Sequence, residues 1–548
     1  MTFDRATALT RLADEEFDVL VVGAGITGAG TAVDAAQRGL RTALVDKGDF
    51  ASGTSSKSSK LVHGGIRYLQ QREIGLVYEA LAERQVLRHT APHLVRILPF
   101  LLPVFTRDGL LPRRLARLLG TTMWMYDLTG GARIGKLHKR ISRDEALAHM
   151  PTLPADNVAA SYIYYDARTD DARLTLAAAR TAADLGAAVA NYATLTGIDK
   201  DAAGRVRVAR ILADGEEIEV RTKTIVNATG VWADGIRALD QPGAEPTIRP
   251  AKGIHITVPW ELVRNDIAAV VPVPKDRRSV FVVPWGADGD GFRYTYIGTT
   301  DTDYDGPVED PQATPEDIAY VLGAINNAVT TTITEADVIG TWAGLRPLVS
   351  AAKSARTADL SRRHAVNRSP GGVVTVTGGK LTTYRRMAAD AVDEIMDALG
   401  RSGRSRTKGL PLHGATGWDA AGIPAHLAER YGSDARSVAG LEQDDPTLAA
   451  PIGIGVPYSR AEIVHIARTE MARTVDDVLS RRTRARIVAR DASAGAAAAV
   501  AALLGAELGW SAAEQQRRAD EYRSAIAAER RAGGLPEHAL DALAEPPA

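Results

Sequence analysis

The sequence predicts an α/β protein in three parts: parallel strands alternating with helices, an antiparallel sheet inserted among them, and an all-helical region at the C-terminal end. Residues 17–47 give an apolar β-branched run, a glycine turn, a helix-forming stretch and a second apolar run, the pattern of a strand–helix–strand unit. Short alternating segments bounded by turn residues recur between residues 206 and 298, as expected for an antiparallel sheet. Beyond residue 414 the pattern is helical to the end.

The first glycine turn has the spacing of a dinucleotide-binding fingerprint. Gly23, Gly25 and Gly28 permit a sharp turn, close approach of a pyrophosphate to the backbone, and tight packing of the helix on the strand. Asp46 ends the second strand eighteen residues after Gly28, where a carboxylate can accept hydrogen bonds from a ribose 2′-hydroxyl. We therefore expect a Rossmann-like domain that binds an adenine dinucleotide. The same spacing also occurs in glycine turns without a ligand, and it does not distinguish FAD from NAD.

Composition excludes several classes of protein. The chain has 548 residues, enough for two or three domains, and a net charge of −1, so no nucleic-acid partner is expected. The absence of cysteine excludes disulfides, thiolate metal sites and cysteinyl flavin attachment, and we expect no metal. The charged N-terminal segment does not suit a signal peptide, and no run of about eighteen apolar residues is evident. We expect a cytosolic protein, or one bound to a membrane surface from the cytosolic side.

One polar stretch is more typical of a binding site than of a linker. Residues 48–60 are rich in serine, glycine and lysine, and their composition alone would suit a flexible linker. They lead directly into residues 61–69, LVHGGIRYL, which combine an apolar start, a glycine pair, and Arg67 beside Tyr68. This combination indicates an ordered backbone at a binding site.

Two further turns indicate close approach of the backbone to a ligand. The apolar strand at residues 224–227 ends in a small-residue turn that includes Gly230. The strand at residues 373–376 opens into residues 377–385, TGGKLTTYR, and a helix, which gives a second helix N-terminus lined by backbone amides. Arg346 lies in another rigid-looking turn, GTWAGLRP.

Two regions leave open how the protein meets a membrane. Residues 98–131 mix apolar residues with arginines, and their prolines exclude a single spanning helix. Within them, residues 113–124 would suit a membrane surface, and the alternative is a buried helix with solvated arginines. An arginine cluster in the C-terminal region is either a solvated helix face or a contact for phospholipid head groups. Its members are Arg481, Arg482, Arg484, Arg486 and Arg490.

The predicted boundaries follow from these segments. Residues 1–400 form discontinuous cofactor-binding and substrate-binding domains, with the substrate sheet mainly within about 90–170 and 245–370. Residues 401–414 are a linker by composition, and residues 415–548 form a helical domain.

Several motifs in one order make the chain resemble FAD-dependent glycerol-3-phosphate dehydrogenases over nearly its whole length. They are the N-terminal fingerprint, SSKLVHGGIRYL, NATG, TGGKLTTYR and the C-terminal TEMARTVDDVLSRRTRARI. The resemblance implies non-covalent FAD, a substrate domain on an antiparallel sheet over the flavin, and a helical cap. It also implies oxidation of sn-glycerol 3-phosphate to dihydroxyacetone phosphate, with electrons passed to a membrane quinone. The expected location is the cytoplasm, with peripheral attachment to the inner face of the cell membrane.

The resemblance also assigns residues. The expected cofactor contacts are Gly23, Gly25, Gly28, Asp46, Thr54, Ser55, Ser59, Gly230, Gly378, Gly379, Lys380, Leu381 and Thr382. The expected substrate contacts are Arg67, Tyr68, His255, Arg346, Arg362 and Lys380. Asp46 stands where the family often has glutamate, a conservative departure that shortens the reach to the ribose.

These residue types suit the chemistry. Arg346, with Arg67 or Arg362, offers planar donor forks for a phosphate dianion. A neutral imidazole at His255 could take the hydroxyl proton while hydride leaves C2, and Lys380 could stabilise an alkoxide or the reduced flavin. The alternatives are that His255 is a hydrogen-bonded sheet residue and that Lys380 contacts only the flavin.

Competing functions remain open in the sequence. The chain could be an oxidase that passes electrons to oxygen, because substrate and flavin motifs would be the same. An amino-acid oxidase is disfavoured, since several cations suit a phosphate better than a single carboxylate. A non-catalytic dinucleotide-binding scaffold or sensor is the alternative from another class. The sequence decides neither the electron acceptor nor the oligomeric state, for which a homodimer is one option.

Overall fold

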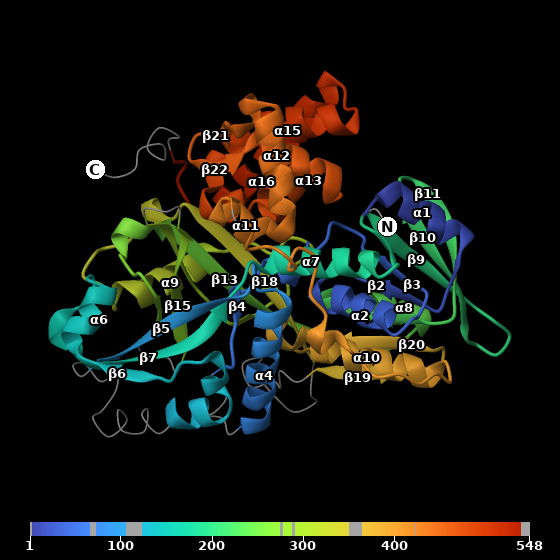
Figure 1. Ribbon diagram of the computed structural model, residues 1–548, viewed down its shortest axis with the longest axis horizontal. Helices are drawn as coiled ribbons and strands as arrows, with labels where there is room; N and C mark the ends of the chain where they lie inside the picture. Colours follow the sequence, from blue (N-terminus) through green and yellow to red (C-terminus); the bar gives the residue numbers. More distant parts are fainter. Residues whose placement is uncertain are drawn as a thin grey trace.

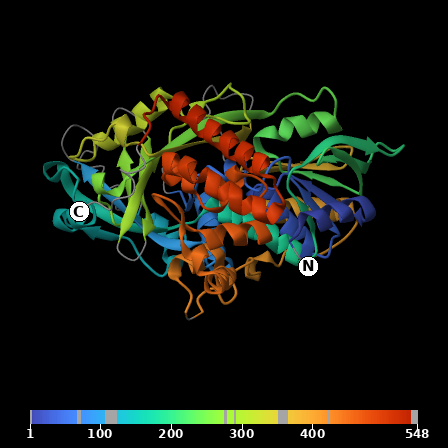
Figure 2. The ribbon, with the colours of Figure 1, turned by 90° about the horizontal axis from the view of Figure 1, so that it is seen from above.

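The computed structural model describes residues 3–65, 73–105, 123–273, 278–287, 291–349, 364–420 and 422–538. Figure 1 shows a parallel sheet with its helices on one side, a large antiparallel sheet on the other, and a helical C-terminal part above their junction. Seen from above in Figure 2, the C-terminal helices lie across the boundary between the two sheets. We call these the parallel-sheet part, the antiparallel-sheet part and the helical part.

The parallel-sheet part is built on six strands in the order β19-β20-β12-β2-β3-β8, all parallel except β19. The strands are β2 (Val19–Val22), β3 (Thr42–Val45), β8 (Ala188–Ala190), β12 (Ile225–Asn227), β19 (Ala365–Arg368) and β20 (Val373–Thr377). All residues of β2 and β3 are buried, because helices cover one face of the sheet and a second, smaller sheet covers the other. The covering helices include α2 (Ile26–Gln37), α7 (Asp171–Asp184) and α10 (Tyr384–Ala398).

The glycine turn between β2 and α2 confirms the predicted strand–turn–helix unit. Gly23 has a φ of +98°, in the region that favours glycine. A Cβ added at Gly28 would lie 1.7 Å from the carbonyl oxygen of Gly23, so α2 can pack this closely only on glycine. Gly28 therefore acts in helix packing.

A small separate sheet accounts for the first alternating segments of the middle region. Its order is β1-β11-β10-β9, and it packs with helix α1 (Arg5–Asp14). The strands are β1 (Glu16–Phe17), β9 (Ala193–Lys200), β10 (Val206–Ala213) and β11 (Glu216–Thr222). The segments after residue 245 join the larger sheet instead.

The antiparallel-sheet part has ten strands, and its one parallel pair is β14 with β5. The strands are β4 (Leu61–Val62), β5 (Arg96–Phe105), β6 (Lys139–Ile141), β7 (Val158–Arg168), β13 (Ile248–Pro259), β14 (Ala268–Pro272), β15 (Ser279–Ala287), β16 (Phe292–Gly298), β17 (Thr302–Asp303) and β18 (Gly340–Val349). Helices α4 (Ile74–Thr90), α6 (Arg143–His149) and α9 (Pro315–Asn326) accompany it. Helix α6 begins in a capping box, with reciprocal bonds between Ser142 and Glu145.

The proline-containing segment of the first half is only partly described. Residues 98–105 belong to strand β5. Residues 106–122 lie outside the described residues, so the predicted membrane-surface segment can be followed only from Met123 onward.

The helical part contains a hairpin that the sequence pattern missed. Its strands, β21 (Pro451–Gly453) and β22 (Val456–Ser459), are too short for an alternating pattern to stand out. Ser459 then begins the next helix in a capping box with Glu462. The helices are α11 (Ala425–Tyr431), α12 (Ala435–Asp444), α13 (Arg460–Thr469), α14 (Ala485–Val488), α15 (Arg490–Leu508) and α16 (Ala512–Gly533).

Among the described residues, α15 is the one helix long and apolar enough to cross a membrane by length and composition. The sequence inspection missed it because its apolar character comes mainly from alanine. Half of its most apolar window is buried, and it packs against α13, α14 and α16. We therefore assign α15 to the core of the helical part.

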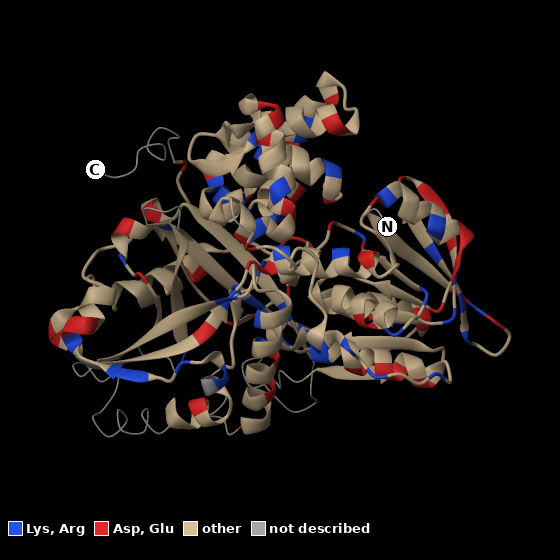
Figure 3. Cartoon of the chain, in the orientation of Figure 1, with Lys and Arg blue, Asp and Glu red and all other residues tan. Residues whose placement is uncertain are grey.

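Both sequence interpretations of the C-terminal arginine cluster are wrong, because the cluster is buried in ion pairs. The Arg482 guanidinium donates to both oxygens of Asp49 at 2.7 and 2.8 Å, and neither side chain is more than 1% exposed. Arg481 also pairs with Asp49, and Arg484 pairs with Asp171. Figure 3 shows basic and acidic residues close together where the helical part meets the rest of the chain. These acids are hundreds of residues away in sequence, so local composition could not reveal the pairs.

The segment predicted as a linker packs against the parallel-sheet part. Arg401 pairs with Asp18 at 3.1 Å, and the Ser405 hydroxyl donates to Asp34. Thr407 is buried. Polar side chains that suit a solvated linker therefore form specific bonds here.

The buried pair between Arg482 and Asp49 predicts a large stability difference between two arginine substitutions. Arg482→Met should destabilise the fold by about 3–5 kcal/mol, because it leaves the Asp49 carboxylate buried with less compensation. Arg517→Met on α16 removes pairs with Glu514 and Glu521 that are exposed to water, so it should leave the unfolding midpoint nearly unchanged. Thermal unfolding of both variants checks this, and equal midpoints would contradict it.

Candidate functional site

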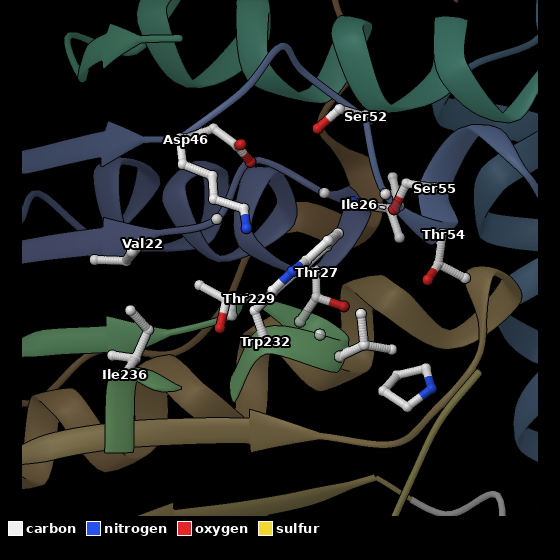
Figure 4. A pocket seen from close by; sticks show the side chains of 18 of the residues that line it. Val22, Ile26, Thr27, Asp46, Ser52, Thr54, Ser55, Thr229, Trp232 and Ile236 are labelled. Carbon is white, nitrogen blue, oxygen red and sulfur yellow. Dashed lines mark hydrogen bonds between the residues drawn. The ribbon is translucent and has the colours of Figure 1, made fainter. Parts of the chain in front are cut away.

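A cavity of about 610 Å³ opens at the carboxyl ends of the parallel strands. The residues that follow β2, β3, β12 and β20 all line it, and this is the edge where open parallel sheets bind ligands. Figure 4 shows its wall, with Asp46 and Ser52 on one side and Thr229, Trp232 and Ile236 on the other. The volume falls within the roughly 300–1,000 Å³ usual for ligand sites.

Ten of the thirteen expected cofactor residues line this cavity. They are Gly23, Gly25, Asp46, Thr54, Ser55, Gly230, Gly378, Gly379, Lys380 and Leu381. Of the other three, Gly28 packs α2 on β2, Ser59 bonds to His255, and the Thr382 hydroxyl bonds to the backbone of His63. Contact of these residues with a cofactor stays a prediction.

The cavity wall is shaped for an anionic ligand close to the backbone. Gly230, with a φ of +60°, lines the cavity, and a Cβ added there would meet no protein atom within 4 Å. A side chain at position 230 would therefore fill space beside the cavity wall that glycine leaves open for a ligand. The first turn of α2 contributes Ile26 and Thr27 to the same wall, where helix amides favour negative charge.

Asp46, which follows the last residue of β3, is hydrogen-bonded to the glycine turn. Its carboxylate accepts from the amides of Ala24 at 2.6 Å and Gly48 at 2.8 Å. Burial nevertheless raises the pKa of Asp46 to about 6, and the two amide bonds only partly offset this. The charge state of Asp46 thus changes within a pH range that is easy to reach.

Thr54 and Ser55 connect the cavity wall to two other elements. The Ser55 hydroxyl accepts from the amide of Ile26 at 2.9 Å, at the first turn of α2. The Thr54 hydroxyl donates to the carbonyl oxygen of Leu345 on β18 at 2.6 Å. The loop after β3 therefore joins the parallel-sheet part to the antiparallel-sheet part.

His255 lies on β13, on a face of the antiparallel sheet next to this loop. Strand register places it opposite Trp342 on β18 and Gly298 on β16. Its ring stacks on Trp342 with centroids 4.6 Å apart and planes 8° apart, and its Nε2 is 2.9 Å from the Ser59 hydroxyl. Nδ1 is buried with no hydrogen-bond partner among the described residues.

The imidazole of His255 is neutral at pH 7. Burial, and then the nearby cations Lys60 and Arg346, hold the pKa of His255 well below 6.5. A neutral ring keeps one nitrogen lone pair available to accept a proton. The position of the ring also depends on Gly298, since a Cβ there would lie 2.3 Å from Cδ2 of His255.

The turn predicted around Arg346 is wrong, because residues 340–347 lie within strand β18, which pairs with β13. Arg346 shares a sheet face with His255, because it lies four residues after Trp342 on the same strand. Its guanidinium donates to Asp301 at 3.0 Å and to the carbonyl oxygen of Thr300 at 3.1 Å. A Cβ added at Gly253 would lie 2.5 Å from Nη2 of Arg346, so glycine at this position makes room for the cation. The next residue, Pro347, lines the cavity.

The structure thus brings most of the expected site together. The cofactor residues surround the cavity, while His255 and Arg346 lie on the adjoining sheet face and are not part of its wall. Arg67, Tyr68 and Arg362 lie outside the described residues.

Sequence reasoning missed several residues that position this site. They are Trp342, Asp301, Gly253 and Gly298. Trp342, Gly344 and Arg346 alternate along the chain, and this period of two could have placed them on one face. The contacts of Asp301 have no such signal, because they depend on sheet pairing far along the chain.

Comparison with known proteins assigns the family. Residues 18–385 match the family model described as FAD dependent oxidoreductase. The chain belongs to this family. Residues 405–515 match a second model, the C-terminal domain of alpha-glycerophosphate oxidase.

Named relatives cover almost the whole chain. The chain is 40% identical over 543 residues to glycerol-3-phosphate dehydrogenase 2 of Mycobacterium tuberculosis, covering 96% of this chain and 90% of that protein. It is 36% identical over 552 residues to the human mitochondrial glycerol-3-phosphate dehydrogenase, covering 94% and 74%. The crystal structure of the Bacillus halodurans glycerol-3-phosphate dehydrogenase with FAD aligns with a TM-score of 0.77 at 28% identity, covering 95% and 96%.

The cavity fits the cofactor of the family. FAD carries a pyrophosphate and a ribose, and the cavity offers a helix N-terminus, glycines without side chains in the way, and the Asp46 carboxylate. Gly378 and Gly379, which follow β20, add a second strand–glycine junction to the cavity wall.

The raised pKa of Asp46 predicts that FAD binds more tightly as pH rises through about 6. Below this pH the acid is neutral and accepts weakly from a ribose hydroxyl; above it the carboxylate accepts strongly. Asp46→Asn should weaken FAD binding by about 10- to 100-fold at pH 7.5 and remove most of the pH dependence. Titration of apoprotein with FAD between pH 5 and 8 checks this. If the FAD affinity of the variant depended on pH as steeply as that of the parent, the prediction would be contradicted.

Proposed function

We propose that this chain oxidises sn-glycerol 3-phosphate to dihydroxyacetone phosphate with FAD and passes the electrons to a quinone at a membrane surface. The observation that supports it best is the pairing of a neutral, buried imidazole with an arginine fork on one sheet face beside the cofactor cavity. A hydroxyl to be deprotonated and a phosphate to be bound require those two groups. The identity to named glycerol-3-phosphate dehydrogenases, over nearly the whole chain, adds to this support.

His255 is the proposed general base. FAD, when bound, takes up the C2 hydrogen of the substrate with two electrons as a hydride. His255 removes the proton of the C2 hydroxyl, and its low pKa keeps it free of a proton beforehand. A dianionic phosphate bound nearby offsets the cations that depress this pKa, so substrate binding makes the imidazole a stronger base.

Arg346 is the proposed phosphate ligand. Its planar fork suits two phosphate oxygens, and Asp301 with the Thr300 carbonyl fixes its orientation in advance. Lys380 lines the cavity, where its ammonium would stabilise negative charge on the substrate oxygen or on the reduced cofactor.

An oxidase that uses oxygen is the second candidate, and one observation favours it. Residues 405–515 match a domain model that takes its description from alpha-glycerophosphate oxidase.

Anaerobic reduction tests the proposal. Glycerol 3-phosphate added to the FAD-loaded protein should bleach the flavin absorbance, and a quinone analogue should restore it faster than oxygen does. Faster recovery with oxygen, accompanied by peroxide, would support the oxidase instead. A flavin that glycerol 3-phosphate does not bleach would contradict both functions.

The two proposed roles predict different kinetic effects. His255→Ala should lower kcat by about 100- to 10,000-fold, the usual effect of losing a general base. Arg346→Ala should mainly raise KM, by about 10- to 100-fold, because a charged hydrogen-bonding partner of the phosphate is lost. Steady-state kinetics with glycerol 3-phosphate check both. Unchanged flavin reduction in both variants would contradict the assignments.

One surface supports peripheral contact with a membrane. Ile74 and Tyr78 on α4 are 46% and 52% exposed, and Trp124 and Leu128 on the adjoining helical segment are 55% and 81% exposed. Figure 1 shows both elements along the lower edge of the molecule. We call these four side chains the α4 end face. A basic residue adjoins it, because the guanidinium of Arg133 lies 4.5 Å from the ring of Tyr78.

An apolar face beside basic residues is typical of binding to a bilayer surface. The buried arginine cluster of the helical part no longer offers an alternative contact. We therefore propose that the α4 end face is the membrane contact.

Leu128→Glu in this face should reduce co-sedimentation with anionic liposomes by about tenfold or more, since it removes apolar area and adds a repelled charge. Bleaching of the flavin by glycerol 3-phosphate should not change. Leu508→Glu is the matched control, because Leu508 is 39% exposed at the end of α15 in the helical part. Equal sedimentation of both variants would contradict the assignment.

A further inference from the structure

Asp171 is the centre of a buried polar cluster that the proposed mechanism does not use. It begins helix α7 and has no exposed surface. One oxygen accepts from the amide and the hydroxyl of Ser58, at 2.9 and 2.7 Å. The other lies 3.2 Å from the ammonium of Lys60 and 2.9 Å from the guanidinium of Arg484. Although burial favours the neutral acid, these two cations keep the pKa of Asp171 below its usual value.

Arg484 brings the helical part into this cluster. Besides Asp171, its guanidinium donates to the carbonyl oxygen of Ser56 at 2.6 Å. Lys60 donates to the same carbonyl oxygen at 3.3 Å. Lys60 and Arg484 both have positive φ, +55° and +70°, a strained conformation that persists only where the surroundings impose it. The shared bonds to Asp171 and Ser56 supply that constraint.

Residues 56–60, the serine loop, carry this constraint to the candidate base. The Ser58 carbonyl oxygen accepts from Nε1 of Trp342 at 3.1 Å, and the Ser59 carbonyl oxygen accepts from the hydroxyl of Tyr296 at 2.9 Å. The Ser59 hydroxyl lies 2.9 Å from Nε2 of His255. Since Nδ1 has no partner among the described residues, the Ser59 bond and the stack on Trp342 determine how the imidazole is oriented.

We propose that Arg484 is a positioning residue: from the helical part, it orders the serine loop through Ser56 and Asp171, and the loop then fixes the imidazole of His255 through Ser59. The inference rests on the proposed function, in which His255 is the base. It assigns the helical part a role in catalysis without any contact between that part and the substrate.

An arginine suits this position for a physical reason. Its Nη2 nitrogen donates to both the Asp171 carboxylate and the Ser56 carbonyl oxygen. Its Nη1 nitrogen donates to the Ser480 carbonyl oxygen at 3.0 Å, within the helical part. The planar fork therefore joins two parts of the chain rigidly. Lysine could restore the charge but could not reproduce the fork.

The test compares Arg484→Met, Ser59→Ala and the double variant as FAD-loaded proteins. Each single variant should lower the kcat for flavin reduction by about 10- to 100-fold, with little change in KM or FAD content, because a small misplacement of the base slows chemistry. The double variant should be at most about twofold slower than Ser59→Ala, because both changes remove the same constraint. Arg484→Lys should recover part of the lost rate.

Arg430→Met is the matched control. Arg430 pairs with the buried Glu462 inside the helical part, and among the described residues its side chain has no bond to the serine loop or β18. It should lower the thermal midpoint as much as Arg484→Met does, with kcat unchanged. A kcat that falls with stability in both variants would show that Arg484 is merely structural.

A readout without substrate separates this inference from the proposed function. Trypsin should cleave Arg484→Met after Lys57 or Lys60 faster than it cleaves the parent or Arg430→Met, because the serine loop loses its partners. If glycerol 3-phosphate does not bleach the parent flavin, the proposed function fails and cleavage alone decides whether Arg484 orders the loop. Rate losses that multiply in the double variant, or cleavage equal to that of the parent, would overturn the proposal.

Discussion

Burial of the Asp171 carboxylate is the constraint on which the rest of the site depends. A charge this deep in a protein is tolerated only with close opposite charges and full hydrogen bonding. Asp171 receives both, from Ser58, Lys60 and Arg484. Two similar cases lie nearby: Asp49 with Arg482, and Glu470 with Arg173 at 2.7 and 2.8 Å. In each case the charges come from both sides of the boundary with the helical part, so separating the parts would leave buried charges unpaired.

One loop carries this constraint into the site. Residues 46–60 begin at Asp46 beside the glycine turn, pass through Asp49, and reach the cavity wall at Thr54 and Ser55. They end in the serine loop beside His255. The cofactor cavity, the proposed base and the interface with the helical part are therefore joined by a single continuous segment.

Local patterns predicted the fold well where the physics is local. Spacing and turn chemistry gave the first strand–glycine–helix unit and the junction at Gly378. Local patterns failed where partners lie far apart in sequence. The C-terminal arginines resembled a solvated face because Asp49 and Asp171, the acids that pair with Arg482 and Arg484, are remote in sequence.

In the site, too, local patterns identified some residues, and the rest depend on partners far apart in sequence. Chemistry and resemblance selected His255 and Arg346, and the structure places both on one sheet face. Their environment, the stack on Trp342 and the space left at Gly253 and Gly298, depends on register between distant strands. The low pKa of His255 is likewise a consequence of burial and of cations supplied by other elements. Amide hydrogen exchange of the FAD-loaded Asp171→Asn variant tests the central claim most directly: the account predicts faster exchange in residues 56–60 with no change in β10 and β11, whereas unchanged protection of residues 56–60 would contradict it.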